Sequence, residues 1–118
     1  MDLPTLEGEW IVEGQYVESV DGVLHMSYRA GEVNLVIQGS ESVEEDRPKM
    51  VVERDGEAIQ HTEAGDDISF DGDASVVYLD GPRMYRLLLS NQHHEGVLTL
   101  QVPKGIRLFA FTFGGACD

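Results

Sequence analysis

The chain alternates between short runs of apolar, β-branched and aromatic residues and short groups of turn-forming residues. The alternation is clearest in Glu32–Gln38, where Val33, Leu35 and Ile37 fall on one face of an extended strand. No window of about 11 residues combines the helical period with good helix formers. Turn signals recur roughly every 8–12 residues, as they do in β-sandwiches and barrels. The pattern therefore predicts an all-β domain.

Further strands are expected wherever an apolar run lies between two turn signals. Gly14 is expected to place a bulge or bend within the first strand. Asp55-Gly56 is a strong signal for a tight hairpin turn, and Ser90–Glu95 is expected to be a polar turn. Besides Glu32–Gln38, the expected strands are Glu9–Ser19, Val23–Ser27, Lys49–Arg54, Glu57–Gln60, Ile68–Phe70, Ala74–Leu79, Arg83–Leu89, Val97–Val102 and Ile106–Phe113.

The last expected strand, Ile106–Phe113, is unusually apolar. Phe109, Phe111 and Phe113 lie on one face, and no charged side chain lies on the other face from residue 108 onward. Burying three phenylalanines contributes several kcal/mol to folding. A strand that is uncharged on both faces is typical of the middle of a sheet. We therefore expect this strand to be central rather than at an edge.

Length and composition favour one folded unit. A chain of 118 residues has the size of an ordinary domain and can bury a core without disulfides or a structural metal. Its hydrophobic fraction of 42% is that of a folded protein. The composition shows neither a linker nor an internal repeat. We expect residues 1–118 to form a single all-β domain of about eight strands, as in sandwiches and barrels.

The formal net charge is −14, and it is unevenly distributed. Residues 1–74 hold 19 acidic and 4 basic side chains, a net −15, whereas residues 75–118 hold 3 and 4, a net +1. An acidic chain repels phosphate backbones and anionic lipid, so neither nucleic acid nor a membrane surface is an expected partner. No apolar run approaches the ~20 residues that span a bilayer, and no signal peptide is expected.

Cys117 is the only cysteine. An intrachain disulfide and a Cys-x-x-Cys pair are therefore both impossible, which excludes dithiol chemistry of the thioredoxin kind in this chain. A zinc site built from several thiolates is excluded for the same reason. No Gly-x-Ser-x-Gly motif or Gly-rich phosphate loop is present, and no carboxylate pair stands out. We expect a protein that is not an enzyme and holds no cofactor, with structural calcium as the one exception considered.

The calcium hypothesis comes from Asp66, Asp67, Asp71 and Asp73, which crowd into a short Gly-containing segment. Clustered carboxylates on a loop are how proteins bind calcium, although the spacing is not that of an EF-hand. The alternative is a solvated loop. The second acidic run, at Glu41, Glu44, Glu45 and Asp46, is expected to be a solvated loop. His93-His94 with Glu95 could hold a transition metal, or could be ordinary turn residues.

Sugar binding by a β-sandwich requires an aromatic platform and a few fixed polar groups. The candidates for such a site are Trp10, Tyr28, Arg29, Arg83 and Tyr85. The alternative is that Trp10 and Tyr85 belong to the core, with the Tyr85 hydroxyl held by a hydrogen bond. Trp10 is the only tryptophan, so a large aromatic platform is not expected.

Several segments follow one another in a recognisable order. The most specific are Pro82-Arg83-Met84-Tyr85 and Phe111-Thr112-Phe113-Gly114. The others are Tyr28-Arg29-Ala30, Val33–Ile37, Val51-Val52 with Asp55-Gly56, and Gly96–Leu100. From about Gly8 to Gly114 the chain resembles the C-terminal β-domain of DipZ-type thiol:disulfide interchange proteins. The resemblance implies that residues 1–118 form a single antiparallel jelly-roll β-sandwich of about eight strands, similar to galactose-binding domains and carbohydrate-binding modules.

The resemblance also implies a function. In that family a membrane domain and a thioredoxin-like domain precede this module, so the redox activity belongs to those parts. The leading hypothesis is a non-catalytic, carbohydrate-binding-like accessory module. The alternative is a protein-interaction or structural module without a small-molecule ligand, which would position a thioredoxin-like domain or self-associate as a homo-oligomer. The expected location is extracytoplasmic if the chain is part of a DipZ-type protein and cytoplasmic if it is free-standing.

Overall fold

The computed structural model describes residues 5–39 and 48–114, without the side chains of residues 39 and 91–94. The described residues form eight strands in one antiparallel sheet, which confirms the all-β prediction. The more specific jelly-roll assignment stays a prediction. The strands are β1 (Thr5–Val12), β2 (Val17–Gly39), β3 (Lys49–Arg54), β4 (Glu57–Ala58), β5 (Ser69–Asp71), β6 (Ala74–Tyr78), β7 (Arg83–Val102) and β8 (Ile106–Gly114).

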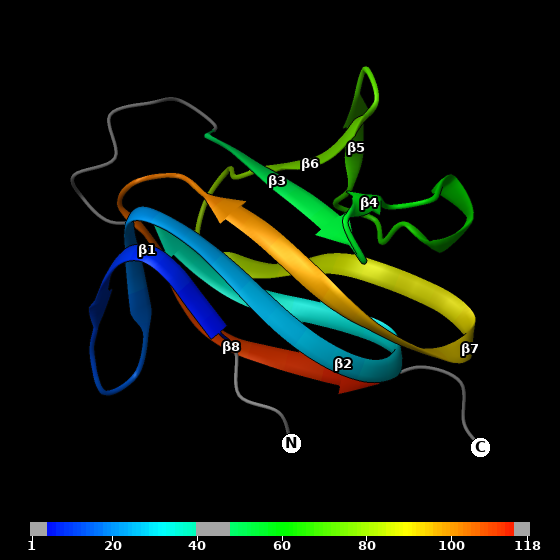
Figure 1. The fold of residues 1–118 in the computed structure, drawn as a ribbon, viewed down its shortest axis with the longest axis horizontal. Coiled ribbons are helices and arrows are strands. Elements are labelled where there is room, and N and C mark those ends of the chain that lie inside the picture. The colour runs from blue at the N-terminus through cyan, green and yellow to red at the C-terminus, as the bar shows by residue number, and fades with distance from the viewer. Residues whose placement is uncertain (1–4, 40–47, 115–118) are drawn as a thin grey trace.

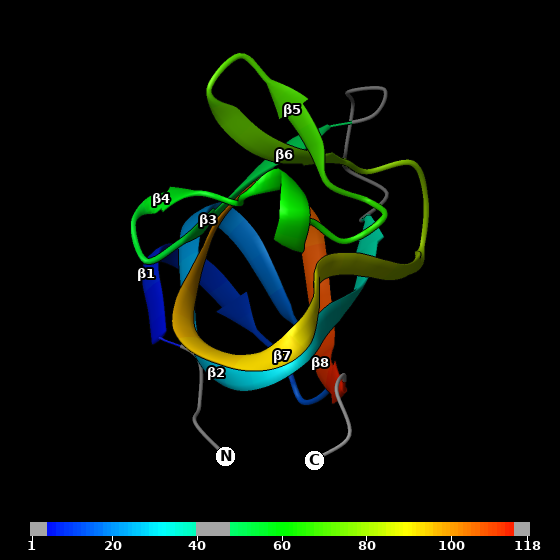
Figure 2. The same cartoon turned by 90° about the vertical axis from the view of Figure 1, so that its right-hand side faces the viewer.

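The sheet has the strand order β1-β2-β7-β3-β6-β5, with β8 paired to β2 and β4 paired to β3. Two strands are much longer than the rest: β2 has 23 residues and β7 has 20. Both curve sharply, so that the sheet folds back over itself and encloses the core (Figure 1 and Figure 2). Among the described residues the only helix is the 3₁₀ turn His61–Glu63, and none there is long and apolar enough to cross a membrane.

The sequence pattern divides each of the long strands into two. The expected strands Glu9–Ser19 and Val23–Ser27 are not separated by a turn at Asp21-Gly22, because both residues lie inside β2 and pair with β1. Ser90–Glu95 is not a turn either, and the prediction of one there is wrong. The register passes from Ala30 opposite His94 to Glu32 opposite Leu89, so residues 90–93 face residue 31 alone. Because of these extra residues in β7, the two paired strands can bend sharply here and still continue as strands. The bend explains why the segment has the polar composition of a turn.

The first expected strand, Glu9–Ser19, is in fact a hairpin. β1 ends at Val12, and the turn is closed by a hydrogen bond from Glu13 N to the carbonyl oxygen of Tyr16 at 2.9 Å. Gly14 therefore lies in the turn, and the bulge lies earlier, between Glu9 and Trp10. The Asp55-Gly56 hairpin is confirmed: both residues have positive φ (53° and 84°), as a type I′ turn requires.

β8 is not central, contrary to the sequence prediction. Its residues 106–114 pair with the second half of β2, and only Arg107 and Leu108 also pair with the first residues of β2. The register shifts at Phe109, between the pairs Ile37–Leu108 and Val36–Ala110. This bulge reverses the alternation of the strand: Leu108 is buried before it, and Phe111 packs against the core after it. The three phenylalanines are consequently only partly buried or exposed.

The core lies between the two folded halves of the sheet. Val33, Leu35 and Ile37 are fully buried from the second half of β2, as the alternation predicts. Leu24 and Met26 face them from the first half. Each such side chain contributes about 1.5–3 kcal/mol by leaving water. Other strands contribute Met50, Val52, Val77, Tyr85, Leu87, Leu98, Leu100 and Ile106.

Candidate functional site

Arg83 and Tyr85, two of the residues predicted to bind a ligand, lie together at the start of β7. The Arg83 guanidinium lies 3.9 Å from the centre of the Tyr85 ring. Its Nη2 donates to Asp67 Oδ1 at 2.8 Å, and its Nε donates to Asp80 Oδ1 at 3.1 Å. The Tyr85 ring is fully buried, and its hydroxyl donates to the carbonyl oxygen of Gly81 at 2.6 Å. The cluster thus fastens the turn between β6 and β7 onto β7.

Asp67 extends this cluster to the loop that precedes β5. Its Oδ2 accepts a hydrogen bond from Arg86 N at 2.7 Å, and its own N donates to the carbonyl oxygen of Arg86 at 3.2 Å. Burial of the Asp67 carboxyl acts to raise its pKa, but the hydrogen bonds from Arg83 and Arg86 N outweigh burial and lower it. The same hydrogen bond to Asp67 raises the pKa of Arg83. The pair is charged across the physiological range.

The lowered pKa of Asp67 predicts a dependence of stability on pH. A carboxyl whose pKa is lower in the folded state stabilises the fold at pH values above its ordinary pKa of about 3.9. This contribution is lost as the pH falls below that value and through the lower pKa of the folded state. Asp67→Asn should therefore be less stable than the parent at pH 7 and should lose less stability on acidification to about pH 3. Urea unfolding at both pH values measures the difference. Parallel pH curves for parent and variant would contradict the prediction.

The cluster leaves little for a ligand to bind. Arg83 also donates from Nη1 to the carbonyl oxygen of Met84 at 3.2 Å, so each of its nitrogens has a partner within the fold. The face of the Tyr85 ring is covered by Arg83. The Pro-Arg-x-Tyr segment therefore has a structural explanation, and its geometry does not support sugar binding at Arg83 or Tyr85.

The other predicted ligand residues are not brought together. Tyr28 is 6% exposed and faces the core, whereas Arg29 is exposed and lies 3.4 Å from Glu95. Burial raises the pKa of the Tyr28 hydroxyl, although the nearby Arg54 guanidinium opposes the shift. Trp10 packs over Gly22, where an added Cβ would lie 2.3 Å from the indole ring. Its Nε1 donates to the carbonyl oxygen of Glu7 at 2.8 Å.

Three of the four aspartates of the calcium hypothesis lie beside three different cations. Asp66 lies 3.5 Å from Arg86, Asp67 binds Arg83, and Asp71 lies 2.9 Å from Lys49. Asp73 is exposed after the β5–β6 turn. Within residues 5–39 and 48–114, no three His, Cys, Asp or Glu side chains are placed to hold a metal ion. The His93 and His94 side chains, Cys117 and the acidic run from Glu41 to Asp46 lie outside the part that is described.

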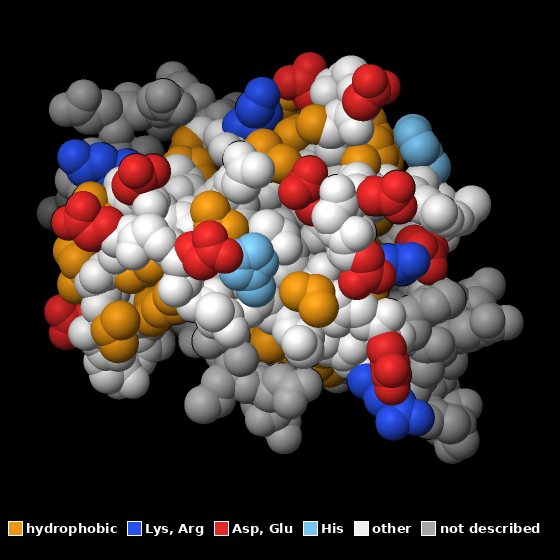
Figure 3. Space-filling view, viewed as in Figure 1, with side chains coloured by type: hydrophobic (Ala, Val, Ile, Leu, Met, Phe, Trp, Pro, Cys, Tyr) orange, Lys and Arg blue, Asp and Glu red, His pale blue; other side chains and the backbone are white. Residues whose placement is uncertain are grey.

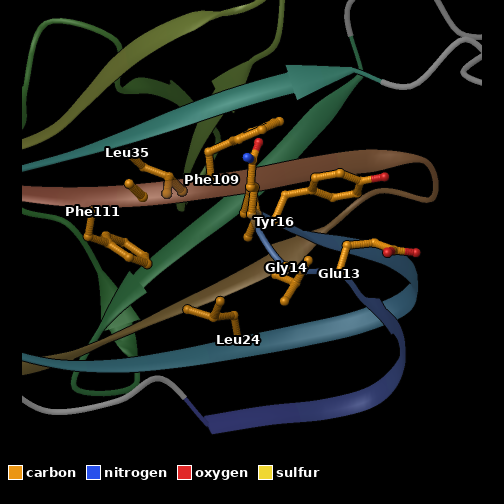
Figure 4. A pocket seen from close by; sticks show the side chains of 11 residues that line it. Glu13, Gly14, Tyr16, Leu24, Leu35, Phe109 and Phe111 are labelled. Atoms are coloured by element: carbon orange, nitrogen blue, oxygen red, sulfur yellow. The ribbon is translucent and has the colours of Figure 1, made fainter.

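A pocket of about 230 Å³ opens at the end of the sandwich near the β1–β2 turn. We call it the aromatic cleft. Leu24, Leu35 and Phe111 line its inner part from the two halves of β2 and from β8, while Tyr16 and Glu13 lie on the side of the turn (Figure 4). Its remaining lining residues are Gly14, Gln15, Val17, Leu108, Phe109 and Ala110. The cleft forms where β8 continues past Val17, the first residue of β2, which pairs with Leu108.

Two partly exposed rings define the mouth of the cleft. The centres of the Tyr16 and Phe109 rings are 5.2 Å apart, and the rings are tilted by 38°. The Arg107 guanidinium lies 4.8 Å from the Tyr16 ring centre, and its Nε donates to Glu18 at 2.8 Å. This arrangement fixes Tyr16 beside the opening.

Apolar and acidic residues surround the cleft. Ile11 and Val12, which precede the β1–β2 turn, are 44% and 68% exposed, and Phe113 is 37% exposed. Glu13 is also exposed in this turn. On the face shown in Figure 3 the acidic side chains are spread out rather than gathered in one patch. An apolar cleft within an acidic surface suits an apolar group better than a polar or anionic one.

Sequence reasoning missed this cleft as a site, although it noted several of its residues. The alternation of Phe109, Phe111 and Phe113 indicated a buried face. The bulge at Phe109 and the separation of the two halves of β2 leave that face partly open instead. The apolar run at Phe109–Phe113 and the apolar pair Ile11-Val12 are the signals in the sequence that point to the cleft.

The family of the chain is identified by comparison with known protein families. Residues 2–114 match the family described as thioredoxin like C-terminal domain. No curated protein matches the chain in sequence. The match covers nearly the whole chain, including both strands that form the aromatic cleft and the Arg83–Tyr85 cluster. The chain is therefore a member of the thioredoxin-like C-terminal domain family.

Proposed function

We propose that this domain is a non-catalytic protein-interaction module, which docks a thioredoxin-like domain through the aromatic cleft. The observation that carries the proposal is the cleft itself: an open, largely apolar pocket bordered by the partly exposed rings of Tyr16 and Phe109. Partly exposed aromatic residues in a concave apolar site are typical anchoring points of protein interfaces.

The size of the cleft supports this choice. Sites for small molecules usually enclose ~300–1,000 Å³. The cleft, at about 230 Å³, is smaller and suits one or two apolar side chains of a partner. Its polar groups are few, at Glu13, Gln15 and Tyr16, whereas a sugar site needs several fixed donors and acceptors.

The choice of partner is supported by the family and by the cysteine content of the chain. The family is described as thioredoxin like C-terminal domain, which fits a domain that acts beside a thioredoxin-like one. The sequence has one cysteine and so supplies no dithiol of its own. We take the module to be of the DipZ type, acting beside an extracytoplasmic thioredoxin-like domain that performs the redox step. A module of this kind would hold the thioredoxin-like domain in place and stabilise it.

The test is a titration of the 118-residue chain with a purified thioredoxin-like domain from a DipZ-type protein, followed by calorimetry. We expect Tyr16→Ser to weaken binding about tenfold or more, because an aromatic anchor at an interface is worth at least ~1.4 kcal/mol. Phe70→Ser is the matched control, since Phe70 is a partly exposed ring on β5, stacked on His61 and not a cleft residue.

Two results would contradict the proposal. One is the absence of binding to the thioredoxin-like domain. The other is equal weakening by Tyr16→Ser and Phe70→Ser, which would place the contact elsewhere. Titration with mono- and oligosaccharides belongs to the same experiment, because the Tyr16 and Phe109 rings are also the surface on which a pyranose would stack. Sugar binding that is lost in Tyr16→Ser would replace the interaction hypothesis with the carbohydrate-binding one.

A further inference from the structure

We infer that the free edge of β8, from Phe109 to Gly114, accepts an extended segment of the partner as an added strand. The segment carries an apolar residue that enters the aromatic cleft and basic residues on either side of it. The inference rests on the proposed function and gives it a mode of recognition. It also specifies the chemistry of the partner: an extended, apolar segment flanked by lysine or arginine.

The backbone of β8 is open on one side. Residues 106–114 pair with the second half of β2, and only Arg107 and Leu108 also have partners across the other edge, at Glu18 and Val17. Beyond Leu108, no described strand pairs with that second edge. Figure 1 shows β8 along the border of the sheet, with β2 on its inner side. Within residues 5–39 and 48–114, no strand pairs with the amide and carbonyl groups on the outer side of Phe109–Gly114, and a partner strand could pair with them.

Apart from the bulge at Phe109, this edge lacks the features that usually protect an exposed strand edge. Exposed edges in native proteins carry charged residues or proline, or are very short. Residues 108–114 contain neither a charge nor a proline. The other outer strands differ: β1 contains Glu7 and Glu9, and β5 has three residues, including Asp71. An unprotected edge on an otherwise acidic protein is best explained by a partner that covers it.

The free edge and the aromatic cleft form one continuous surface. Phe109, Ala110 and Phe111 belong to the edge and also line the cleft. A strand added to β8 would lie between β8 and the β1–β2 turn. Its side chain beside Phe111 would then reach the pocket formed by Leu24 and Leu35, because alternate residues of a strand point to the same face. Backbone pairing and side-chain anchoring thus act on the same segment.

The acidic side chains near the free edge of β8 indicate which kind of strand could bind there. Glu13 lies at the cleft, and Glu32, on the paired strand β2, has its side chain beside Gly114 at the other end of the edge. With a net charge of −14, a second copy of this chain would meet the same acids and be repelled. A segment with basic residues at both ends complements them. The occupant is accordingly a basic segment of a partner protein and not a second copy of the domain.

The experiment uses the unmodified chain and the synthetic peptide KVTFTVK, so that no variant has to fold. We expect binding by calorimetry, together with slower amide exchange at alternate residues of Phe109–Gly114 in NMR spectra. The first control is the same peptide N-methylated at alternate amides, which keeps its side chains and charge but loses backbone donors. The second is EVTFTVE. Each control should bind about tenfold more weakly or worse.

The outcomes separate this inference from the proposed function. Equal binding of the N-methylated peptide, or no protection of residues 109–114, overturns the added strand even if the thioredoxin-like domain binds at the cleft. Binding of KVTFTVK with edge protection supports the inference even if that domain fails to bind and the proposed function falls. A dimer in sedimentation experiments that the peptide dissociates would assign the edge to a second copy and overturn the choice of occupant.

Discussion

Replacing Gly65 with alanine is expected to destabilise the domain by about 3 kcal/mol, a large share of the stability of a small domain. A Cβ at this position would lie 2.4 Å from the carbonyl oxygen of Arg86 and 2.6 Å from its carbon. These are backbone atoms of β7 and cannot move aside as the end of a side chain can. The loop would have to lift away from β7.

Lifting the loop would also break the hydrogen bonds that hold it. Gly65 N donates to the carbonyl oxygen of Leu87 at 3.0 Å, and Asp67 bonds to Arg86 N and Arg83 two residues later. Urea unfolding measures the loss. Gly14→Ala is the control, because an added Cβ there meets nothing within 4 Å and φ is not in the left-handed range. A loss in Gly65→Ala no larger than in the control would show that the loop does not need this close approach.

Tyr85→Ala is expected to cost about 4 kcal/mol, as removal of a buried aromatic ring usually does. The ring is fully buried opposite Leu35, and Arg83 stacks on it. The smaller change Tyr85→Phe keeps the ring and removes the hydroxyl, which bonds to Gly81 and Asp80. We expect Tyr85→Phe to lower the free energy of unfolding by about 1–2 kcal/mol, because Gly81 and Asp80 each lose a hydrogen bond to the hydroxyl.

The two Tyr85 variants separate packing from hydrogen bonding. Chemical unfolding of both, beside the parent, gives the two differences directly. If Tyr85→Phe were as damaging as Tyr85→Ala, the hydroxyl contacts rather than the ring would hold the turn. If neither variant lost stability, the Arg83–Tyr85 cluster would have no structural role, and the explanation given for the Pro-Arg-x-Tyr segment would fail.

The sequence predicts this fold well where short-range rules decide the structure. Alternation in Glu32–Gln38 gives the buried positions of β2, and Asp55-Gly56 gives the β3–β4 turn, because both depend only on neighbouring residues. The sequence-based prediction fails where β2 and β7 bend. Residues 90–93 are polar like a turn, but they remain in the strand because β2 bends beside them. That bend is a tertiary property and leaves no local signal.

The candidate site was predictable only in part. The sequence drew attention to Arg83 and Tyr85, and these residues do interact closely, but as a support of the fold. It also drew attention to Phe109 and Phe111, and assigned them to a buried face. Whether an apolar face is covered depends on the bulge at Phe109 and on which strands lie opposite, and neither is encoded in the local pattern.

The pairing of Val17 with Leu108 joins the beginning of the sheet to its last strand. During synthesis the first half of β2 cannot complete its partners until β8 has left the ribosome, since residues near both ends of the chain are needed at once. Folding is therefore expected to be slow and all-or-none for this domain. Until β8 is in place, the apolar residues of β2 that pack near it lack part of their cover.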